Sequence, residues 1–259
     1  SDTVLHALRQ IDSRLRNKAT EITLDLADSM HRICRYAFPG AKRVIDRFHV
    51  QKLALEAVQE IRIKHRWDAI NADTEAREQA KFSGEKHIPK RLSNGDTLKE
   101  LLARGRYALF KSPDKWTDSQ RQRIDLMFSL YPDLKEAYWL SQHLRVIFSN
   151  KKSTADTARL NLARWYNKVA ESGFKSFNTI AATFYEHSDE IINFFYNRST
   201  NASAESINSK IKAFRAKLHG VNDTLNMICS RHTSLCGSTH LRASSRYGFH
   251  ICLQHLQMS

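Results

Sequence analysis

The first third of the chain alternates two short β-prone runs with one amphipathic segment. The run EITLD ends at Asp25 and the run KRVID ends at Asp46. Between them, the apolar residues of ADSMHRICRYAF recur at helical spacing, and the pair Pro39-Gly40 then breaks the helix. Two strands joined by one crossover helix are expected to pair in parallel, so the pattern predicts a parallel β-α-β unit.

Helical periodicity dominates from about residue 50 onward. Apolar stripes cover about 53–61, 133–148, 154–170 and 176–195. Two capping-box patterns predict further helix starts, and they are formed by Thr97 with Glu100 and by Thr117 with Gln120. The aromatic residues of the later stripes are expected to pack in the core, among them Trp139, Trp165, Phe184 and Phe194.

The segment 70–95 interrupts this helical pattern. It is charged and polar, and it contains Gly84, Pro89 and the turn pair Asn94-Gly95. Such a composition is typical of connecting segments, so we expect a linker or a mobile loop here.

The stretch NRSTNASAESINSKIKAFRAKLHG, residues 197–220, predicts a helix with two different faces. Thr200 or Asn201 can cap its start, and Gly220 can end it. One face is apolar and carries Ala204, Ile207, Ile211, Phe214 and Leu218. A second face carries Glu205, Asn208, Lys212 and Arg215. The helix dipole favours a carboxylate in the first turn, but it does not account for the polar NRSTN or for four cations within eight residues.

Residues 221–259 differ from the rest of the chain. They contain no lysine, one acidic residue and four histidines, with little helical periodicity. Cysteine and histidine at ligand-like spacing suggest a zinc site, with the candidates Cys229, His232, Cys236, His240, Cys252 and His255. The apolar residues that small zinc modules pack around the metal are missing, so zinc is not expected.

Lys and Arg outnumber Asp and Glu by 41 to 27, which gives a net charge of +14. This excess suggests a polyanionic partner such as nucleic acid, and a solubilising surface is the alternative. No apolar run approaches the length of a membrane span, and residues 1–30 lack the pattern of a signal peptide. We therefore expect a soluble protein without a membrane partner.

Three carboxylates are the candidate metal ligands: Asp25, Asp46 and Glu205. In open α/β sheets, ligands bind at the carboxyl ends of the strands, where Asp25 and Asp46 lie. Two divalent ions held by carboxylates can activate an attacking oxygen and stabilise the leaving oxygen of a phosphodiester. The alternative is structural, because aspartates at strand ends also cap helices.

The stretches ITLDLADSMHRICRYAFPGAKRVIDRFHVQKL and NRSTNASAESINSKIKAFRAKLHGV together resemble the DDE-type transposases of bacterial insertion sequences, in the ISL-type family. The similarity runs from residue 1 to about 223. NGDTLKELLARGRYALF and KWTDSQ also resemble pieces of the helical insertion of that family.

The resemblance implies a fold class and a division of the chain. The expected fold is α/β and mostly helical: a partial RNase H-like core, a large all-α insertion and a final core helix. The core would span 1–68, the insertion 69–195, the final helix 196–220 and an atypical tail 221–259. The tail is expected to be disordered or translated out of frame.

The resemblance also implies Mg²⁺- or Mn²⁺-dependent cleavage and strand transfer of DNA at transposon ends and target. Asp25 is similar to the second acidic residue of the catalytic triad and Glu205 to the third; both would be metal ligands. Asp46 and His49 are additional candidates that rank below Asp25, while Asp28 better suits a helix N-cap. DNA contacts are expected from Arg198, Asn201, Asn208, Lys210, Lys212, Arg215 and Lys217.

Further expectations concern the whole protein. The family's first aspartate would lie upstream of Asp25, and no strand carrying it is found in this sequence, so the chain is expected to be a fragment that is inactive alone. The full-length protein is expected to be a homo-oligomer in the bacterial cytoplasm, associated with the nucleoid. The alternative function is a non-catalytic basic helical module that binds nucleic acid or a partner protein.

Overall fold

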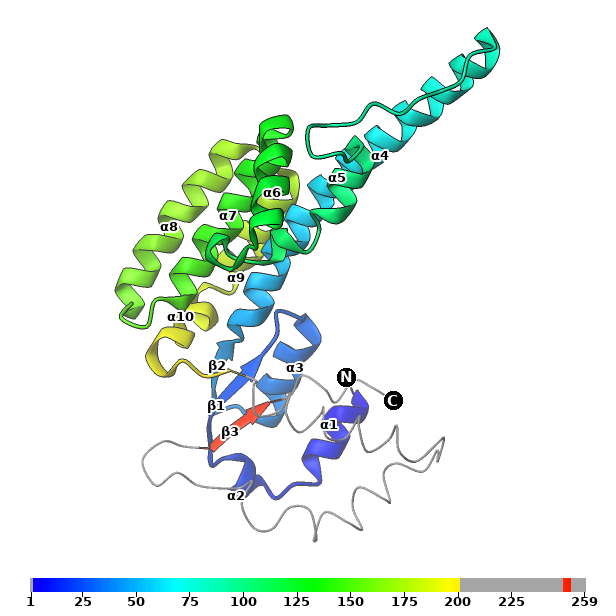
Figure 1. Ribbon diagram of the computed structural model, residues 1–259. Coiled ribbons are helices and arrows are strands. Elements are labelled where there is room, and N and C mark those ends of the chain that lie inside the picture. The colour runs from blue at the N-terminus through cyan, green and yellow to red at the C-terminus, as the bar shows by residue number, and fades with distance from the viewer. Residues whose placement is uncertain (1, 201–248, 253–259) are drawn as a thin grey trace. The chain divides into compact units, whose positions relative to one another are not determined.

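The computed structural model describes residues 2–200 and 249–252, which are mostly helical with one small parallel sheet (Figure 1). The chain forms two compact units. The first contains residues 1–49 and 187–259, and the second contains residues 50–186. The domain boundaries expected from the sequence stay predictions.

The first unit is built on a three-stranded sheet of β1 (Ala19–Leu24), β2 (Lys42–Ile45) and β3 (Phe249–Cys252). The strand order is β2-β1-β3, and both pairings are parallel. Helix α3 (Asp28–Ala37) connects β1 to β2, so the predicted parallel β-α-β unit is confirmed. An RNase H-like core remains a prediction.

Apolar side chains explain why these elements pack together. Ile22, Leu24, Val44 and Ile45 of the strands are completely buried, as is Ile33 of α3. Helix α1 (Asp2–Arg9) buries Val4, Leu5 and Leu8 and contacts α3, and it is followed by the short helix α2 (Ser13–Arg16). Strand β1 is the central strand because it pairs with both β2 and β3, and five of its six residues are buried.

Helix α10 (Ser188–Asn197) returns the chain to the first unit and packs against β2. Two polar contacts join it to Arg43 of that strand. The Glu190 carboxylate pairs with the Arg43 guanidinium at 3.3 Å, and Asn193 Nδ2 donates to the Arg43 carbonyl at 2.8 Å. Strand β2 and helix α10 are far apart in sequence, and both packing and polar contacts hold them together.

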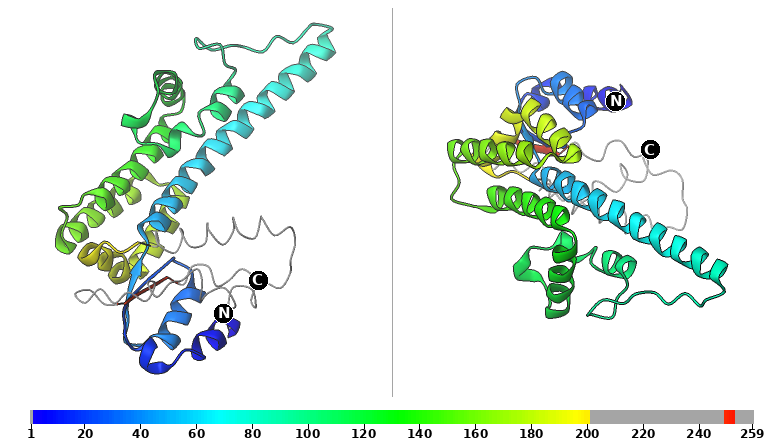
Figure 2. Two further views of the ribbon diagram at one scale, coloured as in Figure 1. Left: turned by 60° about the horizontal axis from the view of Figure 1, so that its bottom comes forward. Right: turned by 90° about the horizontal axis from the view of Figure 1, so that it is seen from above.

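Helix α4 (Arg47–Ser83) is 37 residues long, and Figure 2 shows it without a break. The expectation of a loop from residue 70 was therefore wrong over 70–83. Beyond Arg62 none of its residues is buried, but the segment AINADTEAREQAKF is rich in helix-forming Ala, Glu, Gln, Arg and Lys. Gly84 ends the helix with a φ of 73°, a conformation that glycine adopts without strain. Across the described ranges, no helix has both the length and the apolarity that a membrane crossing needs.

The second unit continues with α5 (Leu98–Arg104), η1 (Ala108–Phe110), η2 (Pro113–Lys115), α6 (Asp118–Leu130), α7 (Pro132–Ser149), α8 (Ala155–Ser172) and α9 (Lys175–Glu186). Both predicted capping boxes are confirmed, at the starts of α5 and α6. The helical stripe over 176–195 is divided into α9 and α10 at His187.

Aromatic side chains form the core of the second unit, as predicted for Trp165 and Phe184. Both are completely buried, and their rings stack with centroids 5.7 Å apart. The prediction for Trp139 was wrong, because its side chain is 49% exposed. Apolar residues occur at helical spacing on both faces of α7. The packing of the neighbouring helices decides which of these faces is buried.

Candidate metal-binding and nucleic-acid-binding site

Asp25 and Asp46 lie at the same edge of the sheet. Leu24 and Ile45 are partners in the parallel register of β1 and β2, and each aspartate is the residue that follows its strand. The Asp46 backbone N–H donates to the Leu24 carbonyl at 2.9 Å, which continues the ladder to this edge. The structure therefore brings these two predicted site residues to neighbouring strand ends.

The two aspartates differ in burial and in what they do locally. Asp46 is completely buried, and its Oδ1 accepts from the Phe48 N–H at 3.0 Å, in the first turn of α4. Asp25 is half-buried, and its Oδ1 accepts from the Ala27 N–H at 3.1 Å. Within the described residues, the second oxygen of Asp25 makes no hydrogen bond. Asp25 thus keeps one oxygen available as a metal ligand, whereas the Asp46 carboxylate is shielded from solvent at the start of α4.

The predicted neighbours of these aspartates take different positions. Asp28 is the first residue of α3 and not its N-cap, which is Ala27. His49 is half-buried in the first turn of α4, where its backbone N–H donates to the Asp46 backbone carbonyl at 3.0 Å. The predicted residues Glu205, Asn201, Asn208, Lys210, Lys212, Arg215 and Lys217 lie outside the described residues.

Arg198 follows α10 in the left-handed conformation, with a φ of 56°. Its guanidinium lies over the rings of Phe194 and Phe195, 5.3 and 5.0 Å from their centroids. Burial lowers the pKa of Arg198, and the charge of Arg47 lowers it further. The charge of Arg47 in the DRFH stretch (46–49) therefore acts on Arg198 in the NRST stretch (197–200), and the two cations make this part of the first unit locally positive. Arg47 was not among the residues that the sequence predicted for the site, although it lies next to Asp46.

A second contact of the NRST stretch was also missed by sequence reasoning. Asn197 Nδ2 donates to Glu21 Oε2 at 2.7 Å, and Glu21 is buried on β1 with 3% of its surface exposed. A charged residue at a buried strand position was the available signal. Such a residue is normally paired, but the sequence does not reveal its partner.

Three metal-ligand side chains gather elsewhere in the first unit: His31, His187 and Glu190. One ligand atom from each lies within 4.8 Å of the others, and in the described part of the chain no other group of three or more does so. The rings of the two histidines stack with centroids 4.3 Å apart. Two features of the sequence could have indicated this group: the spacing His187-x₂-Glu190, and a histidine, His31, among the buried residues of α3.

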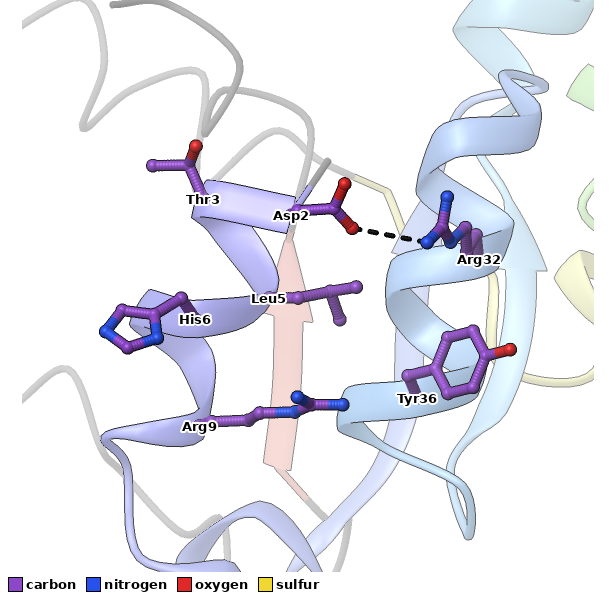
Figure 3. A pocket seen from close by; sticks show the side chains of 7 residues that line it. All are labelled: Asp2, Thr3, Leu5, His6, Arg9, Arg32 and Tyr36. Atoms are coloured by element: carbon purple, nitrogen blue, oxygen red, sulfur yellow. Dashed lines mark hydrogen bonds and ion pairs between the residues drawn. The ribbon is translucent and has the colours of Figure 1, made fainter.

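A pocket between α1 and α3 contains none of the predicted site residues (Figure 3). Its polar lining includes an ion pair between Asp2 and Arg32 at 3.2 Å, and both of these side chains are more than half exposed. Exposed ion pairs of this kind contribute little to stability. The pocket lining is Asp2, Thr3, Leu5, His6, Arg9, Arg32 and Tyr36.

Comparison with known proteins confirms the resemblance seen in the sequence. The model of the ISL3-type DDE family, described as a transposase, matches residues 1–230. Two curated relatives from Mycobacterium tuberculosis, of strains CDC 1551 / Oshkosh and ATCC 25618 / H37Rv, are each a transposase for insertion sequence element IS1557. Each is 26% identical over 222 residues, which covers 84% of this chain and 48% of the relative. The chain therefore spans about half the length of the curated relatives it matches, and no solved structure matches it.

Proposed function

Because the chain belongs to the ISL3-type family of DDE transposases, we propose that it takes part in DNA transposition as a metal-dependent phosphoryl-transfer protein. The reaction is cleavage and strand transfer of DNA at the transposon ends and target. The observation that carries the proposal is the position of Asp25 beside Asp46 at the carboxyl edge of a parallel sheet, where α/β proteins bind their ligands.

Asp25 and Glu205 are the proposed ligands for Mg²⁺ or Mn²⁺. Both ions prefer oxygen ligands, and the half-buried Asp25 carboxylate offers one oxygen that no described residue hydrogen-bonds. When bound, such ions supply charge stabilisation to the attacking and leaving oxygens of a phosphodiester. The Ala27 N–H orients the Asp25 carboxylate through its other oxygen. Asp46 and His49 remain secondary candidates, because Asp46 is buried at the start of α4.

DNA binding is proposed for the basic residues of the NRST stretch and the helix expected after it. Arg47 and Arg198 support this, because their guanidinium groups raise the local positive potential in the same unit as Asp25. Cations of this kind bind phosphates and position a duplex without reading its sequence. The net charge of +14 favours the same kind of partner.

We further propose that the full-length protein is a homo-oligomer that acts on the nucleoid in the bacterial cytoplasm. This proposal rests on the family and on the DNA-binding role. Sedimentation of the protein with a transposon-end duplex measures the number of chains per DNA.

The experiment that tests the metal site is thermal unfolding with and without Mg²⁺ or Mn²⁺. We expect either ion to raise the melting temperature, because an ion that binds only the folded chain stabilises it. Asp25→Asn and Glu205→Gln should each remove most of that rise. Asp28→Asn is the matched control, since Asp28 is an exposed carboxylate three residues from Asp25, and it should keep the full rise.

Two outcomes would count against this function. An unchanged melting temperature in both ions, with DNA affinity intact, favours the non-catalytic basic module. An equal rise in all three variants places the ion elsewhere in the chain.

A further inference from the structure

We propose that His31, His187 and Glu190 form a second metal site, separate from the carboxylate site, which binds a transition-metal ion such as Zn²⁺ through two imidazole nitrogens and one carboxylate oxygen. The site joins α3 to the start of α10 within the first unit. It differs from the zinc ligands considered in the tail, and it uses none of the residues assigned to phosphoryl transfer.

The geometry of the three side chains is close to what zinc requires. Their ligand atoms lie within 4.8 Å of one another. Ligands on a tetrahedral Zn²⁺, with bonds of about 2.0–2.1 Å, lie roughly 3.4 Å apart. Shifts of about an ångström or less would close the site. The two imidazole rings stack face to face, with centroids 4.3 Å apart and an angle of 25° between their planes, so the two histidines are already in contact.

His31 carries the unexplained polar atom. Its side chain is only 7% exposed, and its buried Nε2 has no hydrogen-bond partner among the residues that the structure describes. A buried nitrogen of this kind costs free energy unless something binds it, and a metal ion would do so.

Glu190 is oriented by a partner outside the proposed site. Its Oε1 pairs with the Arg43 guanidinium at 3.3 Å, and its side chain is 15% exposed. Ligating carboxylates are commonly held by such outer hydrogen bonds, which fix their orientation. Arg43 also places a positive charge near the ion, so it orients the ligand while it weakens the attraction for the metal.

The position of the site indicates its role. The chain leaves the first unit after residue 49 and re-enters it at His187, which is itself a proposed ligand. An ion held there would connect the returning segment to α3 and reduce the freedom of the first unit to open. We infer a structural role, because metal binding to preorganised ligands adds directly to folding stability.

The test uses the complete chain, purified without a polyhistidine tag, with Zn²⁺ as the ligand and Co²⁺ as its spectroscopic substitute. We expect one Zn²⁺ per chain and a rise in melting temperature. His187→Gln and Glu190→Gln should each weaken Zn²⁺ binding by about 10–100-fold and remove most of the rise. Both residues are half-buried, so these variants should still fold, which circular dichroism will check.

Two control measurements make the result specific to these three ligands. Arg43→Gln breaks the ion pair but keeps all three ligands, so Zn²⁺ affinity should be retained or should rise. If Glu190 acted only through its ion pair with Arg43, Arg43→Gln would lower Zn²⁺ affinity as much as Glu190→Gln does. Co²⁺ bound at this site should show visible bands without thiolate charge transfer, because no cysteine is among the ligands. Binding that is unchanged in His187→Gln and Glu190→Gln, or a thiolate spectrum, would overturn the proposal. Asp25→Asn should leave Zn²⁺ binding unchanged, so failure of one site is distinguishable from failure of the other.

Discussion

Asn197 donates a hydrogen bond to the buried carboxylate of Glu21 across 2.7 Å, and this contact ties the first residue of the NRST stretch to the central strand. The two residues are far apart in sequence, and each lies a few positions from a proposed functional residue. Asn197 precedes Arg198, and Glu21 lies on the strand that ends before Asp25. The contact therefore fixes the position of the NRST stretch relative to the strand that ends before Asp25.

The first prediction concerns this hydrogen bond. Asn197→Ala should lower the free energy of unfolding by about 1–2 kcal/mol, because a bond to a charged, buried acceptor is lost. Asn197→Asp should cost more, since it places a second carboxylate against Glu21. Urea denaturation measures both. Asn178→Ala, at an exposed position of α9, is the matched control, and an equal effect there would contradict the prediction.

The second prediction concerns DNA affinity and salt. Each phosphate contact releases counterions, so the affinity should fall steeply as salt is raised. Lys212→Ala should weaken binding similarly for all sequences and reduce the slope of log affinity against log salt by about 1. Fluorescence anisotropy across a salt series measures this slope. Lys86→Ala, at an exposed residue beyond α4, should leave the slope unchanged. A flat response of the wild-type chain to salt would exclude a DNA-binding role of this kind.

The third prediction concerns acid. Asp73 accepts from Lys99 Nζ at 2.6 Å and pairs with His87 Nε2 at 3.0 Å, and these hydrogen bonds lower its pKa to about 2. A carboxyl group whose pKa is lower in the folded chain than in the unfolded chain stabilises the fold above its ordinary pKa near 3.8, and this contribution is lost as the pH falls toward 2.

Asp73→Asn should therefore lower the melting temperature at neutral pH, and its difference from wild type should shrink between about pH 4 and pH 2. Thermal unfolding across this range measures the difference. Asp156→Asn is the control, because the Asp156 side chain is 92% exposed. A constant difference at every pH would show that the ion pairs of Asp73 are not its source.

The fourth prediction concerns the aromatic core of the second unit. Trp165 is completely buried, and its Nε1 donates to the Leu140 carbonyl at 3.0 Å. Trp165→Phe should lower the free energy of unfolding by about 1–3 kcal/mol, because it removes the hydrogen bond to the Leu140 carbonyl and opens a small cavity. Trp139→Phe should change it by less than about 0.5 kcal/mol, as expected for an exposed position. Comparable losses in both variants would contradict the observed burial.

Local patterns in the sequence predicted the elements whose formation depends on nearby residues. The β-prone runs before Asp25 and Asp46, the amphipathic α3 and the capping boxes of α5 and α6 all appear where they were expected. The length of α4 was missed because a polar composition was taken for a loop, although its residues favour an exposed helix. The division at His187 was missed because both helices carry apolar residues at compatible spacing.

The sequence by itself determined the family, through many matched residues in order, and the parallel pairing of β1 with β2, through the length of their connection. Only the tertiary structure decided which distant residues meet. The hydrogen bond of Asn197 to Glu21 and the group of His31, His187 and Glu190 both join segments separated by the whole second unit. The physical reason is that side-chain periodicity reports which face of an element is buried, whereas its partner depends on how the returning helix α10 packs on β2.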